Sequence, residues 1–126
     1  MKPHFTLLFR PLLAAFGAFA LIASAPSAAQ NALDDVLKAK EIKIAIPTDF
    51  PPYGFVGTDL KPQGLDVDMA NYIGAKLGVK TELVVVTSAN RIPYLQTKKA
   101  DLVISTLGKN AERERVIDFT AAYSPF

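Results

Sequence analysis

The 126-residue chain is predicted to adopt an α/β fold in which helices flank a parallel three-stranded sheet. Apolar, β-branched runs alternate along the chain with segments whose apolar residues recur every three to four positions, which is the pattern of strands alternating with helices. Such alternation implies right-handed crossovers between parallel strands. The expected strand order places residues 41–46 between residues 81–86 and residues 101–105.

The amino-terminal segment is expected to be an export signal and not part of this fold. Positive charge at Lys2 and Arg10 precedes a continuously apolar run over residues 12–23, and small residues suited to a cleavage site follow it. An uncleaved membrane anchor is the alternative, but the apolar run is shorter than the roughly 20 residues that span a bilayer. We therefore expect a signal peptide at residues 1–29 and one domain at residues 30–126.

Charge and composition exclude several kinds of site. The net charge of +2 comes from Lys2 and Arg10, so the rest of the chain is balanced and carries no basic patch for nucleic acid. The single histidine, His4, lies in the predicted signal, and the chain has no cysteine. We therefore expect no metal site of the His/Cys kind, no cofactor and no Ser/His/Asp catalytic unit.

The first half of the chain supplies two helices and a strand. Residues 32–39 place apolar side chains on one face of a short helix, and a strand at residues 41–46 stops at a proline. Residues 47–63 are rich in proline, glycine, aspartate and aromatic residues and are expected to form a loop. Asp66 is the expected N-cap of the next helix, which Gly78 ends.

The second half of the chain supplies the other two strands. A β-branched strand at residues 81–86 precedes a short helix that Asn90 caps and that runs through Thr97. Residues 101–105 form the third strand. A polar loop then leads to a short helix near residues 111–115, and the remaining chain is expected to be extended.

Two loops leave the carboxyl ends of these strands, at residues 47–55 and 105–110, where ligands bind in open sheets of this kind. In the first loop, the proline after Phe50 favours an extended backbone and stiffens the segment. We expect the ring of Phe50 to cover the apolar part of a small ligand. Tyr53 and Phe55 are expected to cap the core.

The second loop ends beside a potential anion site. Asn110 can cap the helix that follows, and the amino terminus of a helix offers unpaired N–H groups to a carboxylate. Arg113, in the first turn of that helix, can present a planar fork to the same anion. The alternative is that Arg113 belongs to a solvated face with Glu112, Glu114 and Arg115, and spacing alone leaves both interpretations open.

Three motifs together resemble those of a known family. They are "DFPPYGF" from Asp49, "GLDVDMANYIGAKLG" from Gly64 and "KKADLVISTLGKNAERERVIDFTAAY" from Lys98. With them, the chain from Leu33 to Phe126 resembles the amino-terminal lobe of the family 3 extracellular solute-binding proteins, the polar amino-acid receptors of ABC importers. The resemblance implies part of the first lobe of a two-lobed type II periplasmic-binding-protein fold.

The resemblance also implies roles for five residues of the two loops. Arg113 matches the arginine that pairs with the α-carboxylate of the ligand. Thr106 and Gly108 match positions that hydrogen-bond the ligand, and Ser105 matches a hydroxyl-bearing neighbour. Phe50 matches the ring that lies against the ligand side chain.

Two positions depart from the family pattern. Asn110 stands where the family commonly has threonine, and both residues can cap a helix. Gly108 stands in place of a hydroxyl residue, which leaves its backbone N–H as the group that can reach the ligand. Asp66 and Asp68 are interpreted as structural residues at a helix start.

The resemblance implies a monomeric periplasmic protein that is not an enzyme and that binds an amino acid for an ABC permease. Family members are about twice as long as residues 30–126, and their second lobe carries the acidic residue that receives the α-amino group of the ligand. We therefore expect a truncated form that binds weakly or not at all. The alternatives are a periplasmic dehydratase that acts on prephenate-like acids, and the sensory domain of a receptor.

Overall fold

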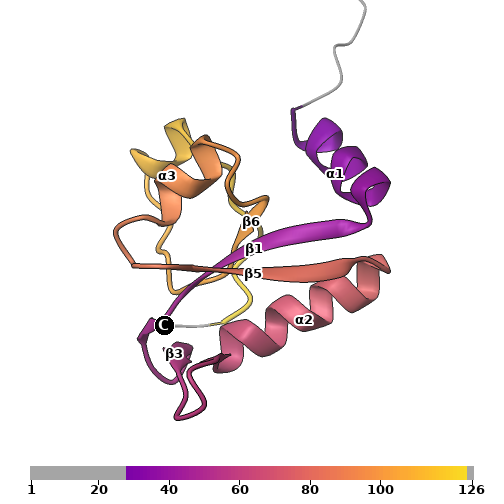
Figure 1. The fold of residues 1–126 in the computed structure, drawn as a ribbon. Coiled ribbons are helices and arrows are strands. Elements are labelled where there is room, and N and C mark those ends of the chain that lie inside the picture. The colour runs from indigo at the N-terminus through magenta and orange to yellow at the C-terminus, as the bar shows by residue number, and fades with distance from the viewer. Residues whose placement is uncertain (1–27, 125–126) are drawn as a thin grey trace, which may run out of the picture.

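A three-stranded parallel sheet forms the centre of the computed structural model, which describes residues 28–124 (Figure 1). Its strands are β1 (Glu41–Pro47), β5 (Lys80–Val86) and β6 (Leu102–Val103), in the order β5-β1-β6. Both pairings of β1 are parallel. The predicted α/β class and strand order are confirmed, although the third strand is shorter than residues 101–105.

The central strand β1 is paired on both of its edges. β5 pairs with it along its whole length, and β6 pairs with Ile44 and Ala45. Asp101, directly before β6, makes two hydrogen bonds to Lys43 of β1. Its backbone N–H donates to the Lys43 carbonyl and its carboxylate accepts from the Lys43 N–H, each at 2.8 Å. Ile44, Ala45 and Ile46 consequently have no exposed surface.

Among the described residues, three helices flank this sheet: α1 (Ala28–Ala39), α2 (Leu65–Leu77) and α3 (Arg91–Gln96). Figure 1 shows α2 along one side of the sheet and α3 on the other. The helix expected at residues 32–39 is therefore present but begins earlier, and the short helix expected after Asn90 is present.

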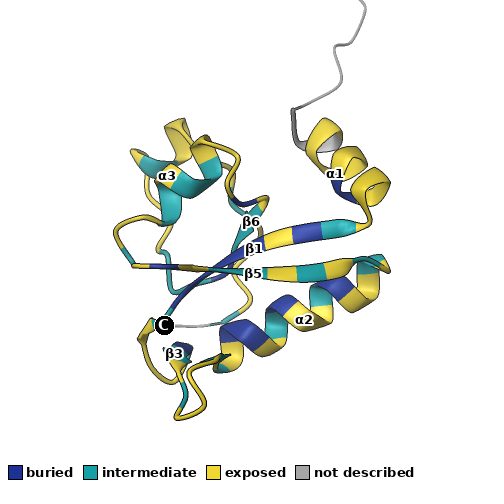
Figure 2. Ribbon diagram, viewed as in Figure 1, coloured by how far each residue is buried: buried dark blue, intermediate teal, exposed yellow. Residues whose placement is uncertain are grey.

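The two faces of β1 belong to separate clusters of buried side chains, since successive residues of a strand point in opposite directions. Ile44 and Ile46 pack in one cluster with Val67 of α2. Ala45 lies in the other cluster, against which Tyr94 of α3 packs. Figure 2 shows the same arrangement, with burial concentrated along β1 and on the side of α2 that faces the sheet.

The start of α2 differs from the prediction. The expected N-cap, Asp66, lies inside the helix, and Gly64 takes the N-cap position with no side-chain cap. Gly64 has a φ of 120°, and a side chain there would meet the carbonyl of Tyr53, so the chain turns into the helix at a point that suits glycine alone. Gly78 ends the helix in the left-handed conformation, as predicted.

Asp66 instead connects α2 to the carboxyl-terminal segment. It is 3% exposed and accepts a hydrogen bond from the Tyr123 hydroxyl at 3.4 Å. Burial raises the pKa of Asp66. Burial and the neighbouring Asp66 raise the pKa of Tyr123 to about 12, so the hydroxyl keeps its proton and the bond persists at neutral pH.

The segment expected to be a loop at residues 47–63 contains a second, antiparallel sheet. Its strands are β2 (Asp49–Phe50), β3 (Gly54–Val56) and β4 (Pro62–Gln63). The expectation was wrong because strands of two or three residues are too short to show an alternating pattern. In the turn between β2 and β3, the Tyr53 N–H donates to the Phe50 carbonyl at 3.1 Å.

The helix expected near residues 111–115 is a single 3-10 turn, η1 (Arg113–Arg115). It stops early because Val116 leaves the helical conformation, with φ −127° and ψ −16°. Asn110 accepts a hydrogen bond from the Arg113 backbone N–H through Oδ1 at 2.9 Å, which is the capping contact expected of it. Asn90 makes no such side-chain bond at the start of α3.

Within the described part of the chain, no helix is long and apolar enough to cross a membrane. The predicted signal peptide at residues 1–29 lies outside the described residues, apart from residues 28 and 29 at the start of α1. The domain boundary at residue 30 therefore stays a prediction.

We expect Ile44→Ala to lower the free energy of unfolding by about 2–5 kcal/mol, because it truncates a fully buried side chain of the central strand. Val85→Ala on the adjacent strand is the control, since Val85 is 51% exposed, and its loss should stay within about 1 kcal/mol. Urea unfolding followed by circular dichroism measures both variants. If both variants lose the same free energy of unfolding, the assignment of β1 to the core is contradicted.

Candidate ligand-binding site

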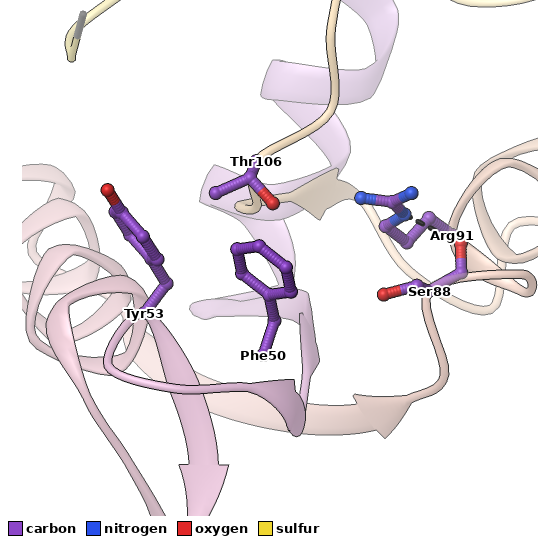
Figure 3. Close-up of a pocket in the computed structure, with 5 residues that line it drawn as sticks. All are labelled: Phe50, Tyr53, Ser88, Arg91 and Thr106. Carbon is purple, nitrogen blue, oxygen red and sulfur yellow. Dashed lines mark hydrogen bonds between the residues drawn. The ribbon is translucent and has the colours of Figure 1, made fainter. Parts of the chain in front are cut away.

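A cavity of about 590 Å³ lies at the carboxyl end of the parallel sheet (Figure 3). Its lining residues are Phe50, Tyr53, Ser88, Arg91 and Thr106. Phe50 and Tyr53 follow β1 in the chain, Ser88 and Arg91 follow β5, and Thr106 follows β6. All three strands therefore contribute to the edge at which open parallel sheets bind ligands.

Phe50 and Tyr53 form an aromatic wall of this cavity. Their ring centroids lie 5.9 Å apart with an angle of 27° between the ring planes. Phe50 lies on β2 and is 49% exposed. The expectation that Tyr53 caps the core is wrong, because the turn after β2 carries the half-buried Tyr53 ring to the cavity beside Phe50 (Figure 3).

Asp49 and Ser88 orient Arg91 at another part of the cavity. The Asp49 carboxylate accepts hydrogen bonds from the Ser88 backbone N–H at 3.1 Å and from the Ser88 hydroxyl at 2.9 Å. The Ser88 carbonyl accepts from Nε of Arg91 at 2.7 Å (Figure 3). The bonds from Ser88 hold the pKa of Asp49 below its ordinary value, so this carboxylate is charged at neutral pH.

The loop from Ser105 to Gly108 is hydrogen-bonded to a guanidinium group at each end. Nη1 of Arg91 donates to Oγ of Ser105 at 3.4 Å, and Nη1 of Arg113 donates to the carbonyl of Gly108 at 2.6 Å. Thr106 lies between these two points and lines the cavity. The loop that carries three of the predicted site residues is thus anchored by two arginines.

Arg91 and Arg113 place two positive charges beside this loop. Burial lowers the pKa of Arg91, and the charge of Arg113 lowers it further, whereas the charge of Asp49 acts in the opposite direction. An arginine stays protonated despite such shifts. Both guanidinium groups can therefore attract an anion, although Glu112 lies beside Arg113 in the smaller cavity.

The five predicted site residues are distributed over two adjoining regions. Phe50 and Thr106 line the cavity, and Ser105 contacts Arg91. Gly108 is bonded to Arg113, and Arg113 lines a neighbouring cavity of about 330 Å³. The other residues that line this smaller cavity are Ile92, Gln96, Asn110, Glu112 and Val116.

Sequence reasoning missed Ser88 and Arg91. Both belong to the run "TSANR", which follows the strand at residues 80–86 directly. Because ligands bind beyond the carboxyl ends of parallel strands, the position of this run directly after a predicted strand is a signal for both residues. In the described residues, no group of three or more His, Cys, Asp or Glu side chains could hold a metal ion.

The family model for bacterial extracellular solute-binding proteins, family 3, matches residues 42–125. The chain belongs to this family. The matched residues include both sheets, apart from Glu41 at the start of β1, and every residue that lines the larger cavity. The family resemblance inferred from the three sequence motifs is therefore confirmed.

Two curated relatives of this family 3 protein come from Pseudomonas aeruginosa. Cyclohexadienyl dehydratase is 31% identical over 116 residues, and L-arginine-binding protein is 31% identical over 112 residues. These alignments cover 91% and 88% of this chain but 43% and 40% of the relatives. The chain therefore spans less than half the length of these curated relatives.

A solved structure supports the expected lobe. The arginine-bound form of domain 1 from TmArgBP, the ArgBP of T. maritima, is 36% identical to this family 3 protein, with a TM-score of 0.69. The match covers 71% of each chain. The predicted fold, part of the first lobe of a two-lobed binding protein, is confirmed.

We expect Asp49 to titrate below 3.8 in the folded chain, because Ser88 donates two hydrogen bonds to its charged form. Ser88→Ala removes the hydroxyl but retains the backbone N–H, whose effect on the pKa is larger. The pKa in this variant should therefore rise only part of the way to 3.8. NMR titration of the carboxyl carbon measures both values.

The sign of the associated pH dependence follows from linkage. A lowered carboxylate pKa means that the folded chain binds fewer protons than the unfolded chain, so Asp49 favours folding above its unfolded-state pKa. This contribution is lost as the pH falls through the folded-state pKa. A pKa at or above 3.8 in the unmodified chain would show that the Ser88 bonds do not form in solution.

Proposed function

We propose that this chain binds an amino acid through its carboxylate and forms the ligand-binding lobe of the periplasmic component of an ABC importer. The observation that carries the proposal is the loop from Ser105 to Gly108, which has a guanidinium group at each end and an aromatic wall beside it. Guanidinium groups bind carboxylates through two parallel N–H···O bonds.

Arg113 is the proposed ligand of the α-carboxylate. One of its N–H groups donates to the Gly108 carbonyl, and a guanidinium has five N–H donors, so others remain for an anion. The Asn110 side chain fixes the backbone at Arg113. Thr106 adds a hydroxyl at the cavity, and Phe50 adds an apolar surface for the aliphatic part of the ligand.

The relatives support an amino-acid ligand bound by one lobe. L-arginine-binding protein is named for its ligand, and domain 1 from TmArgBP was solved in an arginine-bound form. A charge-assisted hydrogen bond contributes roughly 1.5–3 kcal/mol, whereas micromolar affinity requires about 8 kcal/mol after the costs of association. We therefore expect this chain to bind with a dissociation constant in the millimolar range.

A dehydratase is the second candidate, because cyclohexadienyl dehydratase is 31% identical to this chain. Dehydration needs a general acid that protonates the departing hydroxyl. The five residues that line the larger cavity include neither a carboxylic acid nor a histidine. Binding without catalysis is therefore the function that these side chains support best.

An assay of phenylpyruvate formation from prephenate separates these two candidates. If the chain is a binding module, the rate should not exceed that in buffer. A rate that exceeds the buffer rate and is lost on heat denaturation of the protein would favour the dehydratase.

The cellular setting belongs to the same proposal. The family is described as extracellular, which together with the predicted signal peptide supports a periplasmic location. There the chain would act as a monomer and offer its ligand to an ABC permease in the inner membrane.

We expect Arg113→Ala to abolish the stabilisation of the chain by its amino-acid ligand, whereas Arg115→Ala should retain it. Arg113 is bonded to the proposed binding loop, and Arg115 is exposed in the same 3-10 turn. Ligand at about ten times its dissociation constant should add roughly 1.4 kcal/mol to the free energy of unfolding. Thermal unfolding with a panel of amino acids measures this effect. If both variants lose the ligand-induced stabilisation equally, Arg113 does not bind the ligand and is better interpreted as part of a solvated face.

A further inference from the structure

Two backbone hydrogen bonds join the start of α2 to the turn that carries the aromatic wall of the larger cavity. The Asp66 N–H donates to the Tyr53 carbonyl at 2.8 Å, and the Leu65 N–H donates to the Pro52 carbonyl at 3.3 Å. A side chain at Gly64 would meet both of these carbonyls, so the helix and the turn are in close contact. The first turn of α2 therefore sets the position of the Tyr53 backbone.

The side chain of Asp66 contacts the carboxyl-terminal segment, residues 118–124. Its carboxylate is buried and accepts a hydrogen bond from the Tyr123 hydroxyl at 3.4 Å. Within residues 28–124, Tyr123 is the one side chain that donates to this carboxylate. A buried carboxylate that lacks a donor is costly in free energy. The contact therefore links the first turn of α2 to the seating of the carboxyl-terminal segment.

Tyr123 also lies close to Tyr53. Burial is the largest cause that raises the pKa of Tyr123 to about 12, and the charges of Asp66 and Tyr53 raise it further. Tyr53 can act in this way because the two phenol groups are near each other. The Tyr53 ring in turn stacks on Phe50, and both rings line the cavity (Figure 3). A continuous series of contacts thus leads from Tyr123 to the aromatic wall.

We propose that Tyr123 is a positioning residue for ligand binding, and that its hydroxyl, through Asp66, holds the Tyr53 ring in place at the larger cavity. The inference rests on the proposed function and deepens it, because it makes the affinity of the cavity depend on the carboxyl-terminal segment. Tyr123 does not line the cavity, so its effect on a ligand is indirect. Since coupling is reciprocal, a ligand that packs against Tyr53 strengthens the contact between Tyr123 and Asp66 by the same factor.

The aromatic wall benefits from such support because its own strands are short. β2 and β3 are paired at two positions, Asp49 with Phe55 and Phe50 with Gly54. Tyr53 lies in the turn between these strands. A wall that is held in place before the ligand arrives reduces the entropic cost of binding.

The first test needs no ligand. Tyr123→Phe keeps the ring and removes the hydroxyl, and we expect it to shift the ring signals of Tyr53 in NMR spectra of the chain with labelled tyrosine. Tyr72→Phe is the matched control, because it removes a hydroxyl from a tyrosine of α2 that is 58% exposed. It should leave the Tyr53 signals in place. If these signals do not move in Tyr123→Phe, the inference is overturned.

The second test measures the affinity for L-arginine, the ligand for which one relative is named, by NMR titration. We expect Tyr123→Phe to weaken binding by about threefold, the effect of one lost hydrogen bond, and Tyr72→Phe to leave it unchanged. Asp66→Asn keeps an acceptor oxygen for the Tyr123 hydroxyl and should retain most of the affinity.

A double-mutant cycle shows whether the two side chains act together. Asp66→Leu removes the acceptor and should weaken binding as much as Tyr123→Phe does. If the hydroxyl acts through Asp66, combining the two changes adds no further loss. Additive losses would overturn the route through Asp66. If Asp66→Leu does not fold, as judged by circular dichroism, Tyr123→Phe and Asp66→Asn decide the question.

The outcomes separate this inference from the proposed function. If Tyr123→Phe lowers the free energy of unfolding but binds L-arginine as tightly as the unmodified chain does, the contact is merely structural. That result would overturn the inference and leave amino-acid binding intact. If the unmodified chain binds neither L-arginine nor any other amino acid of a panel, the proposed function and this inference both fail.

Discussion

The pairing of β1 on both edges is the constraint on which the rest of the structure depends. Because β5 and β6 both run parallel to β1, the three strands end at the same edge of the sheet. The buried side chains of β1 fix this arrangement against α2 on one face and against the cluster beside α3 on the other. The segments that follow the strands are thereby brought together, although they are far apart in the sequence.

At that edge, two guanidinium groups are bonded to one short loop. Arg91 and Arg113 come from segments on either side of β6, and each is bonded to the loop that follows this strand. The Asp49–Ser88 contact fixes the orientation of Arg91. Such an arrangement is suited to carboxylate recognition, because the donors are positioned and partly desolvated before an anion arrives.

Much of the fold was predictable from the sequence, because its longer strands and helices have clear local patterns. The β-branched runs identified strands that alternate with helices, which indicated a parallel sheet. Gly78 indicated the end of α2. The second sheet was missed because its strands are very short. The N-cap of α2 was misassigned because burial of Asp66 against Tyr123 depends on residues distant in sequence. Phe50 and Thr106 were expected at the cavity. Ser88 and Arg91 could have been expected there too, because their run directly follows a predicted strand, whereas Tyr53 reaches the cavity through the turn after β2, which the sequence did not predict.

The most direct measurement is a map of backbone amide chemical shifts on addition of L-arginine, the ligand for which one relative is named, to the unmodified chain. The account predicts the largest shifts at Ser88, Thr106 and Gly108, which belong to the segments that follow β5 and β6. It predicts little change at Tyr72, which is 58% exposed on α2. Largest shifts on α2, with the amides of these three residues unmoved, would contradict carboxylate binding at the strand ends.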